Sequence, residues 1–192
     1  GGGGWGRGVV RARAAGVASG LPAVGVAQSP VASAAPGEVV RSIRFPVLGG
    51  ASVVDTFGAP RSGGRTHAGQ DLFAPKLRTL VATTDGTVVR MSNTASGLSG
   101  NYVVVEDAQG WEYVYIHLNN DTPGTDDGAN RHLEAFVPGI YPGAQVYAGQ
   151  PLGYLGDSGN AETTPPHVHF EIRQPDGTPV NPYDTLMAAS HE

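Results

Sequence analysis

Residues that break helices recur so often in this sequence that a long helix has little room to form. Its 192 residues include 29 glycines and 15 prolines, and both residue types interrupt helices. Turn pairs such as Asp85-Gly86, Gln109-Gly110 and Asp176-Gly177 separate short runs rich in Val, Ile, Tyr and Thr, a pattern typical of β-strands. We expect strands at Glu38–Arg44, Thr79–Thr83, Gly86–Ser92, Tyr102–Asp107, Glu112–Leu118, Gln145–Ala148, Leu152–Leu155 and His167–Arg173. Only Tyr183–Ser190 has a helical pattern, so the sequence predicts an all-β domain, an antiparallel sheet with a barrel-like shape and one short C-terminal helix.

The charge distribution separates the first 36 residues from the rest. Residues 1–36 contain three arginines and no acid, whereas the remainder holds nine basic and 17 acidic residues, a balance of −8. Nucleic acid is therefore an unsuitable partner, because a protein that grips phosphates needs clustered Lys and Arg. The sequence has no cysteine, so any metal must be held by histidines and carboxylates.

Residues 1–36 have the pattern of an export signal. A basic stretch from Arg7 to Arg13 precedes an apolar run of small residues from Ala14 to Ala27. Small-residue cleavage signals follow at Gly25-Val26-Ala27 or Ala32-Ser33-Ala34. The segment is too short and too rich in glycine for a membrane span. We expect a signal-peptide remnant at 1–36, or alternatively a disordered leader without an export role, and a folded domain at 37–192.

The segment His167–Arg173 predicts a pair of histidines on one face of a strand. Side chains alternate along a strand, so His167, His169 and Glu171 share one face. Val168, Phe170 and Ile172 share the other, which we expect to face the core. Applied to Tyr113–Leu118, the same alternation predicts a core stripe of Val114, Ile116 and Leu118, with Tyr113, Tyr115 and His117 on the opposite face.

A third element is His67-Ala68-Gly69-Gln70-Asp71. A spacing of four residues brings the histidine and the aspartate to one side of the chain. A neutral imidazole and a carboxylate are suitable zinc ligands, although a histidine hydrogen-bonded to a nearby aspartate explains the pair equally well.

Taken in order, these motifs resemble peptidase family M23, the zinc metallopeptidases of the lysostaphin or LytM type that cleave peptidoglycan peptides. The resemblance covers roughly Phe45 to Asp184 and implies a LytM-type groove. Supporting motifs are Asp55-Thr56-Phe57-Gly58, Asp85-Gly86-Thr87-Val88, Gly149-Gln150-Pro151-Leu152-Gly153 and Gly156-Asp157-Ser158-Gly159.

The resemblance implies a role for each residue of the site. The metal ligands of the family correspond to His67, Asp71 and His169 here. Three protein ligands leave a fourth position open, as a catalytic zinc requires. The remaining histidines, His117 and His167, would handle protons. We expect His117 to be the base and His167 to stabilise the oxyanion or protonate the leaving amine, although these two roles can be exchanged.

Three features differ from the family pattern or extend it. An aromatic residue precedes the first motif in the staphylococcal branch, whereas Arg61 and Arg65 occupy this stretch here. We expect these arginines, with Tyr115, to bind substrate, or the arginines to be ordinary surface residues. An insertion at 119–143 follows His117 and is expected to lie beside the groove. Its aspartates Asp121, Asp126 and Asp127 form either a calcium site or a solvated acidic loop.

Two functions agree with these residues. The first is an exported zinc metalloendopeptidase in the bacterial cell envelope, outside the cytoplasmic membrane, that hydrolyses stem or cross-link peptides of peptidoglycan. The second is a catalytically silent module of the same fold that binds cell wall or activates an amidase. Silent relatives typically lose ligands, whereas this chain keeps all five site positions, which favours the enzyme. A regulatory partner and hydrolysis of a peptide from outside the wall are left open.

Overall fold

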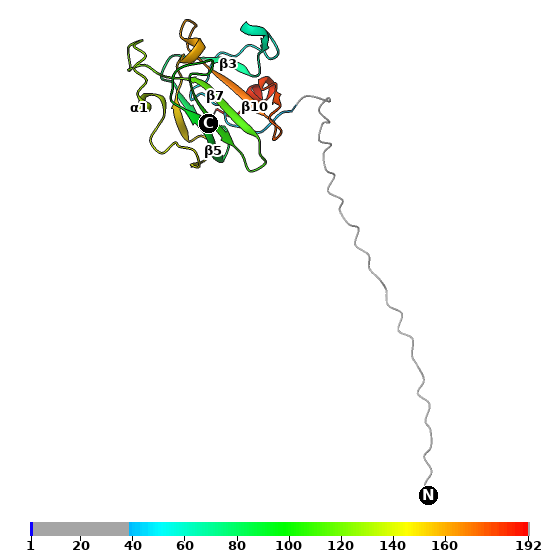
Figure 1. Ribbon diagram of the computed structural model, residues 1–192. Coiled ribbons are helices and arrows are strands. Elements are labelled where there is room, and N and C mark those ends of the chain that lie inside the picture. Colours follow the sequence, from blue (N-terminus) through cyan, green and yellow to red (C-terminus); the bar gives the residue numbers. More distant parts are fainter. Residues whose placement is uncertain (2–38, 192) are drawn as a thin grey trace. The chain divides into compact units, whose positions relative to one another are not determined.

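The computed structural model of the protein describes residues 39–191 and Gly1, so the predicted export segment, apart from Gly1, lies outside the described residues. Short antiparallel strands dominate it, as predicted (Figure 1). The strands are β1 (Pro60–Arg61), β2 (Arg65–Thr66), β3 (Gln70–Phe73), β4 (Thr79–Val81), β5 (Gly86–Ser92), β6 (Asn101–Glu106), β7 (Glu112–Leu118), β8 (Gln145–Val146), β9 (Pro151–Tyr154), β10 (His167–Arg173) and β11 (Pro179–Val180). The helices are α1 (His132–Ala135) and α2 (Tyr183–Ala188), with 3-10 turns at Ser62–Gly64 and Gly159–Ala161. None of the helices among the described residues is long and apolar enough to cross a membrane.

The main sheet has seven strands, and its centre carries the histidine-rich segments. Its order is β11-β10-β7-β6-β5-β8, and β3 pairs with β10 outside this path. Strand β10 thus has β7 on one edge and β3 followed by β11 on the other. Figure 1 shows β7 and β10 running side by side through the middle of the domain. The sheet does not close into a barrel over residues 39–191.

The core lies against one face of β10. Val168, Phe170 and Ile172 are fully buried there, which confirms the predicted alternation. They pack with residues from β3, β6 and β7 and with side chains from α1 and α2. The opposite face of β10 carries His167, His169 and Glu171 and lines a groove.

The predicted faces of β7 are wrong for most of the strand. Tyr113 and Tyr115 belong to the core, whereas Ile116 lines the groove. The reason is a β-bulge at His117, where Asn101 pairs with Leu118 and Tyr102 pairs with Ile116, so that His117 has no partner on β6. A bulge inserts one residue and reverses the alternation beyond it. Leu118 is therefore in the core as predicted, and His117 reaches the groove although Tyr115 does not.

The bulge gives His117 an uncommon backbone conformation. Its φ is 68°, in the left-handed region that non-glycine residues rarely occupy. Such conformations persist where the surrounding structure enforces them, often at functional sites. Here the backbone N–H of His117 donates to the Ser99 carbonyl oxygen, and its own carbonyl accepts from Gly156.

The structure differs from the strand prediction in several places, and the short strands β1, β2 and β11 are not predicted. Within the expected strand Glu38–Arg44, the described residues form only an isolated bridge between Arg44 and Ser190. Conversely, the sequence pattern does not predict β3, whose residues Gln-Asp-Leu-Phe include none of the β-branched types that favour strands. Its pairing with β10 comes from tertiary contacts.

Gly69 allows the close approach that brings β3 to β10. A Cβ atom added at this position would overlap the backbone carbonyl oxygen of Phe170 and crowd the side chain of Glu171. A Gly69→Ala variant must therefore push β3 away from β10, and we expect it to lose about 1–3 kcal/mol of unfolding free energy, the usual cost of overpacking. Urea denaturation of the two proteins measures the loss. Equal stability would show that the two strands separate without cost.

Candidate functional site

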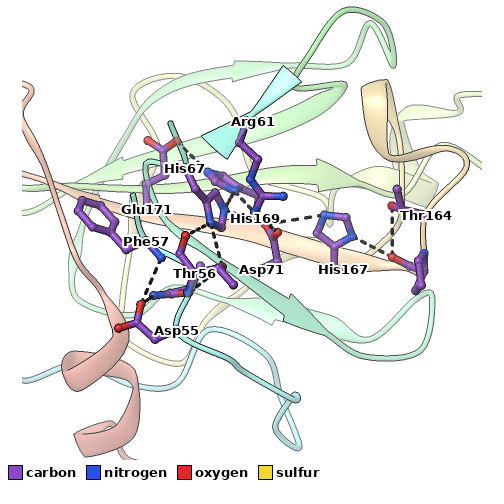
Figure 2. Close-up of polar contacts among 12 residues, drawn as sticks. Asp55, Thr56, Phe57, Arg61, His67, Asp71, Thr164, His167, His169 and Glu171 are labelled. Atoms are coloured by element: carbon purple, nitrogen blue, oxygen red, sulfur yellow. Dashed lines mark hydrogen bonds and ion pairs between the residues drawn. The ribbon is translucent and has the colours of Figure 1, made fainter. Parts of the chain in front are cut away.

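The pairing register of the sheet brings the first and last motifs together. Asp71 on β3 lies directly opposite His169 on β10, and opposed residues of antiparallel strands share a face. His67, from the turn before β3, completes the group (Figure 2). The predicted set of His67, Asp71 and His169 is thus assembled from two strands and a turn, and its three ligand atoms all lie within 4.8 Å of one another.

The three side chains direct their polar atoms at a common point. The Nε2 atom of His67 lies 3.1 Å from Asp71 Oδ1, and the Nδ1 atom of His169 lies 3.0 Å from the same oxygen. The two ring nitrogens are 2.9 Å apart. His67 is buried and the other two are nearly so.

A second layer of contacts assigns a tautomer to each ring. The Nδ1 atom of His67 lies 3.0 Å from the Thr56 carbonyl oxygen, which only accepts, so this nitrogen carries the proton. The Nε2 atom of His169 lies 2.9 Å from a carboxylate oxygen of Glu171 and is assigned a proton for the same reason. When neutral, each ring therefore turns an unprotonated nitrogen toward Asp71; in the absence of a cation, a proton on that nitrogen forms the hydrogen bond to the carboxylate. Two lone pairs and a carboxylate oxygen meet at one point, an arrangement that requires a cation or a proton between them.

The electrostatics of the cluster follow from this convergence. Burial acts to raise the pKa of Asp71, but hydrogen bonds to His169 and His67 outweigh it and hold that pKa far below its usual range. Burial acts to lower the pKa of His169, yet its contacts with Asp71 and Glu171 give a net increase. Glu171 keeps a lowered pKa despite its burial, because His169 and Arg173 stabilise its charge. Asp71 and Glu171 are therefore carboxylates at neutral pH.

His117 and His167 lie beside this cluster without joining it. Their ring centroids are 5.1 Å apart, and His117 is 6.3 Å from the His169 ring. Each Nδ1 atom lies 2.8 Å from a backbone carbonyl oxygen, that of Ser158 for His117 and that of Pro165 for His167. Both rings thus keep Nε2 for other partners. Burial, followed by the neighbouring His167, lowers the pKa of His117 to about 4, so His117 is neutral at neutral pH.

The residues expected to bind substrate have three different environments. Arg61 donates to Asp71 Oδ2 at 2.6 Å, the oxygen that does not face the imidazoles. Arg65 is exposed and lines the groove. The prediction that Tyr115 binds substrate is wrong, because its side chain is fully buried and its hydroxyl donates to the Val81 carbonyl oxygen. The bulge at His117 explains the error.

The groove has a volume of about 1020 Å³ and exposes polar and apolar side chains. Besides the five predicted site residues, its lining includes three arginines and several apolar residues. They are Arg61, Arg65, Arg173, Phe73, Leu98 and Ile116. A site of this size in an open groove accommodates several residues of an extended chain.

Two acidic residues of the 119–143 insertion and Asp157 surround a lysine. Asp121, Asp126 and Asp157 approach the ammonium group of Lys76 at 2.6, 2.7 and 2.8 Å. Asp127 instead accepts from the backbone N–H groups of Thr122 and Ala129. Two of the three predicted calcium ligands, Asp121 and Asp126, thus converge with Asp157 within 4.8 Å, but all three carboxylates already contact the Lys76 ammonium group, which supplies the positive charge. The lysine ties the insertion to the loop that precedes Ser158, whose carbonyl orients His117.

Comparison with known proteins identifies the same part of the chain. Residues 65–182 match the model of peptidase family M23. The murein hydrolase activator NlpD of Escherichia coli is 30% identical over 139 residues, which are 72% of this chain and 30% of NlpD. The DD-carboxypeptidase/endopeptidase Mpg of Neisseria meningitidis is 32% identical over 123 residues, which are 64% of this chain and 23% of Mpg.

Similarity to a solved structure extends over most of the domain. LytM from Ruminococcus gnavus superimposes with a TM-score of 0.57 and 28% identity, covering 76% of this chain and 59% of that one. The chain spans less than a third of the two curated relatives. The family match contains all five predicted site residues. They are Asp71 on β3, His117 on β7, His167 and His169 on β10, and His67 in the segment before β3. The chain therefore belongs to peptidase family M23.

Proposed function

We propose that the protein is an exported zinc metalloendopeptidase that hydrolyses amide bonds in the peptides of peptidoglycan. The observation that carries this proposal is the convergence of two imidazole nitrogens and one carboxylate oxygen in the lining of an open groove. Two further histidines stand within reach of the same point. The family match and the similarity to Mpg agree with this chemistry.

The donor set fits a zinc ion. Nitrogen and oxygen ligands from two histidines and one aspartate suit Zn²⁺, and three protein ligands are typical of catalytic sites. Zinc bound by His67, Asp71 and His169 would polarise a peptide carbonyl and acidify a water molecule. Thr56 and Glu171 fix the two rings by holding their other nitrogens, an outer layer typical of metal sites. Arg61 holds the second oxygen of Asp71.

The two remaining histidines supply the proton transfers. His117 is neutral and has its Nδ1 proton bound to Ser158, so its Nε2 accepts a proton from the attacking water. His167 is held in the same way by Pro165, and its Nε2 lies 3.9 Å from Asp71 Oδ1. Once Nε2 also carries a proton, His167 would stabilise the developing oxyanion or protonate the leaving amine from this position. Residues 1–36 would direct the enzyme to the cell envelope.

The similarity to NlpD favours a second candidate, activation of a murein hydrolase. The two functions differ in what the purified protein does alone. A peptidase releases new amino groups from purified peptidoglycan without a second enzyme, and a metal chelator stops the release. An activator alone releases nothing, but it accelerates the detachment of stem peptides from glycan when an amidase is added. Counting amino groups and detached peptides with and without the amidase separates the two.

Glu171 offers a test of the metal site that does not depend on activity. Its carboxylate contacts His169 Nε2 and is held in turn by Arg173. Exchange for the neutral amide in a Glu171→Gln variant weakens this support, and we expect zinc affinity to fall about 10–100-fold, as for other outer residues of metal sites. Competition with a chromophoric chelator measures the affinity. A Glu106→Gln variant on β6 is the control, and equal affinities in all three proteins would contradict the assignment.

A further inference from the structure

Two arginines face each other across the small hairpin at the rim of the groove. Arg61 on β1 and Arg65 on β2 are directly opposed in the pairing register, and both line the groove. Like charges in opposed positions of a β-ribbon destabilise it. The hairpin therefore maintains an unfavourable pair at a place where an anion would relieve it.

Asp71 balances only one of the two charges. The guanidinium of Arg61 forms an ion pair with Asp71 Oδ2 at 2.6 Å. Arg65 has no ion pair with an acidic side chain anywhere in residues 39–191. The third arginine of the groove, Arg173, is paired with Glu171 at 2.5 Å. Arg65 is thus the arginine in the groove whose charge remains for a ligand.

The guanidinium of Arg65 is already oriented. Its Nε donates to the Ser62 carbonyl oxygen at 3.1 Å, and its Nη2 donates to the Ser62 hydroxyl at 3.2 Å. These bonds use one edge of the planar group and leave the edge formed by Nη1 and the second Nη2 hydrogen. Such an edge binds a carboxylate through two parallel hydrogen bonds. Because Ser62 holds the plane, less side-chain entropy is lost when a ligand binds.

We propose that Arg65 binds a free carboxylate of the peptide substrate, so that the enzyme selects wall peptides with an unamidated acidic group near the cleaved bond. This proposal rests on the proposed peptidase function. Phe73 and Leu98 expose apolar surface in the same groove, at 39% and 55% of their areas, which suits short aliphatic side chains such as alanine. The preferred substrate is therefore an acidic, alanine-containing peptide rather than a glycine-only bridge.

The test compares two forms of one substrate. A cross-linked peptide dimer is purified from muramidase-digested peptidoglycan, and half of it is amidated at its carboxylates with carbodiimide and ammonium. We expect the wild-type enzyme to cleave the free dimer with about tenfold higher kcat/KM than the amidated one, the value of a charge-assisted hydrogen bond at an exposed site. The Arg65→Ala variant should lose this preference, because its kcat/KM should fall for the free dimer and stay unchanged for the amidated one. Arg131→Ala, an exposed arginine of the insertion, should behave as wild type.

The controls separate this proposal from the peptidase function itself. Zinc content of Arg65→Ala must equal that of wild type, which excludes an indirect effect through His67. Equal losses on both dimers, or no loss on either, would overturn the role of Arg65. If the wild-type protein cleaves neither dimer, the peptidase function fails. Titration calorimetry then measures the affinity of the wild-type protein and of Arg65→Ala for the free dimer, which tests the carboxylate site separately. About tenfold weaker binding by Arg65→Ala would then support the carboxylate site, and equal binding would overturn it.

Discussion

A His169→Ala variant will bind no zinc and will not cleave peptidoglycan. His169 contributes the Nδ1 atom that faces Asp71 and His67, and it is the only histidine of β10 whose ring is held by Glu171. Its removal leaves one imidazole and one carboxylate, too few ligands for a stable catalytic zinc. Loss of the several kcal/mol that a metal ion contributes to the transition state corresponds to a rate decrease of about 10³-fold or more.

Metal analysis of the purified variant measures this effect directly. We expect about one zinc per chain in the wild-type protein, as for a single three-ligand site, and background in His169→Ala. His132→Ala is the matched control, because His132 is an exposed histidine on α1 outside the groove. Zinc retained by His169→Ala at the wild-type level would show that the cluster is not the metal site.

The second large effect separates proton transfer from metal binding. A His117→Ala variant should retain its zinc and lose about 10²–10⁴-fold in kcat, the usual contribution of a general base. The ring lies 6.3 Å from that of His169 and has its own partner in the Ser158 carbonyl oxygen, so its removal leaves the three ligands in place. Substrate affinity should change little, because the loss falls on the chemical step.

Zinc content and kinetics must be measured on the same preparation of His117→Ala. Its unfolding free energy should also be recorded, since residue 117 has a positive φ that alanine tolerates no better than histidine. A stable variant with one zinc and full turnover would assign the base to His167 instead. A stable variant without zinc would place His117 among the ligands and overturn the division of roles.

The strands that carry the site are predictable from the sequence because their patterns are strong. The runs that predict β5, β7 and β10 have the same bounds as the observed strands, since turn residues delimit each of them. The apolar alternation of Val168, Phe170 and Ile172 also predicts correctly which face of β10 carries the histidines. The five histidine and aspartate positions follow from a resemblance to family M23, whose membership the comparisons support over residues 65–182.

Features that depend on tertiary contacts could not be predicted. The bulge at His117 depends on how β7 pairs with β6. The one extra residue places Tyr115 in the core and Ile116 in the groove, the reverse of the predicted faces. Strand β3 forms through its pairing with β10 and the bridge between Phe73 and Ser52. The partners of the four imidazoles include the backbone carbonyls of Thr56, Ser158 and Pro165, and every residue has such a group. Glu171 was the one outer partner with a sequence signal, because it shares the face of His169.

The most direct test of the proposed function is a zinc titration of chelator-stripped protein during hydrolysis of purified peptidoglycan. New amino termini are counted after each addition of zinc, and bound zinc is measured in parallel. If His67, Asp71 and His169 form one catalytic metal site, the rate should rise with bound zinc and reach its plateau at about one equivalent per chain. The rate should stay at background with His67→Ala. Hydrolysis that continues in the stripped protein, or a fully zinc-loaded protein that releases no amino termini, would contradict the proposed zinc endopeptidase.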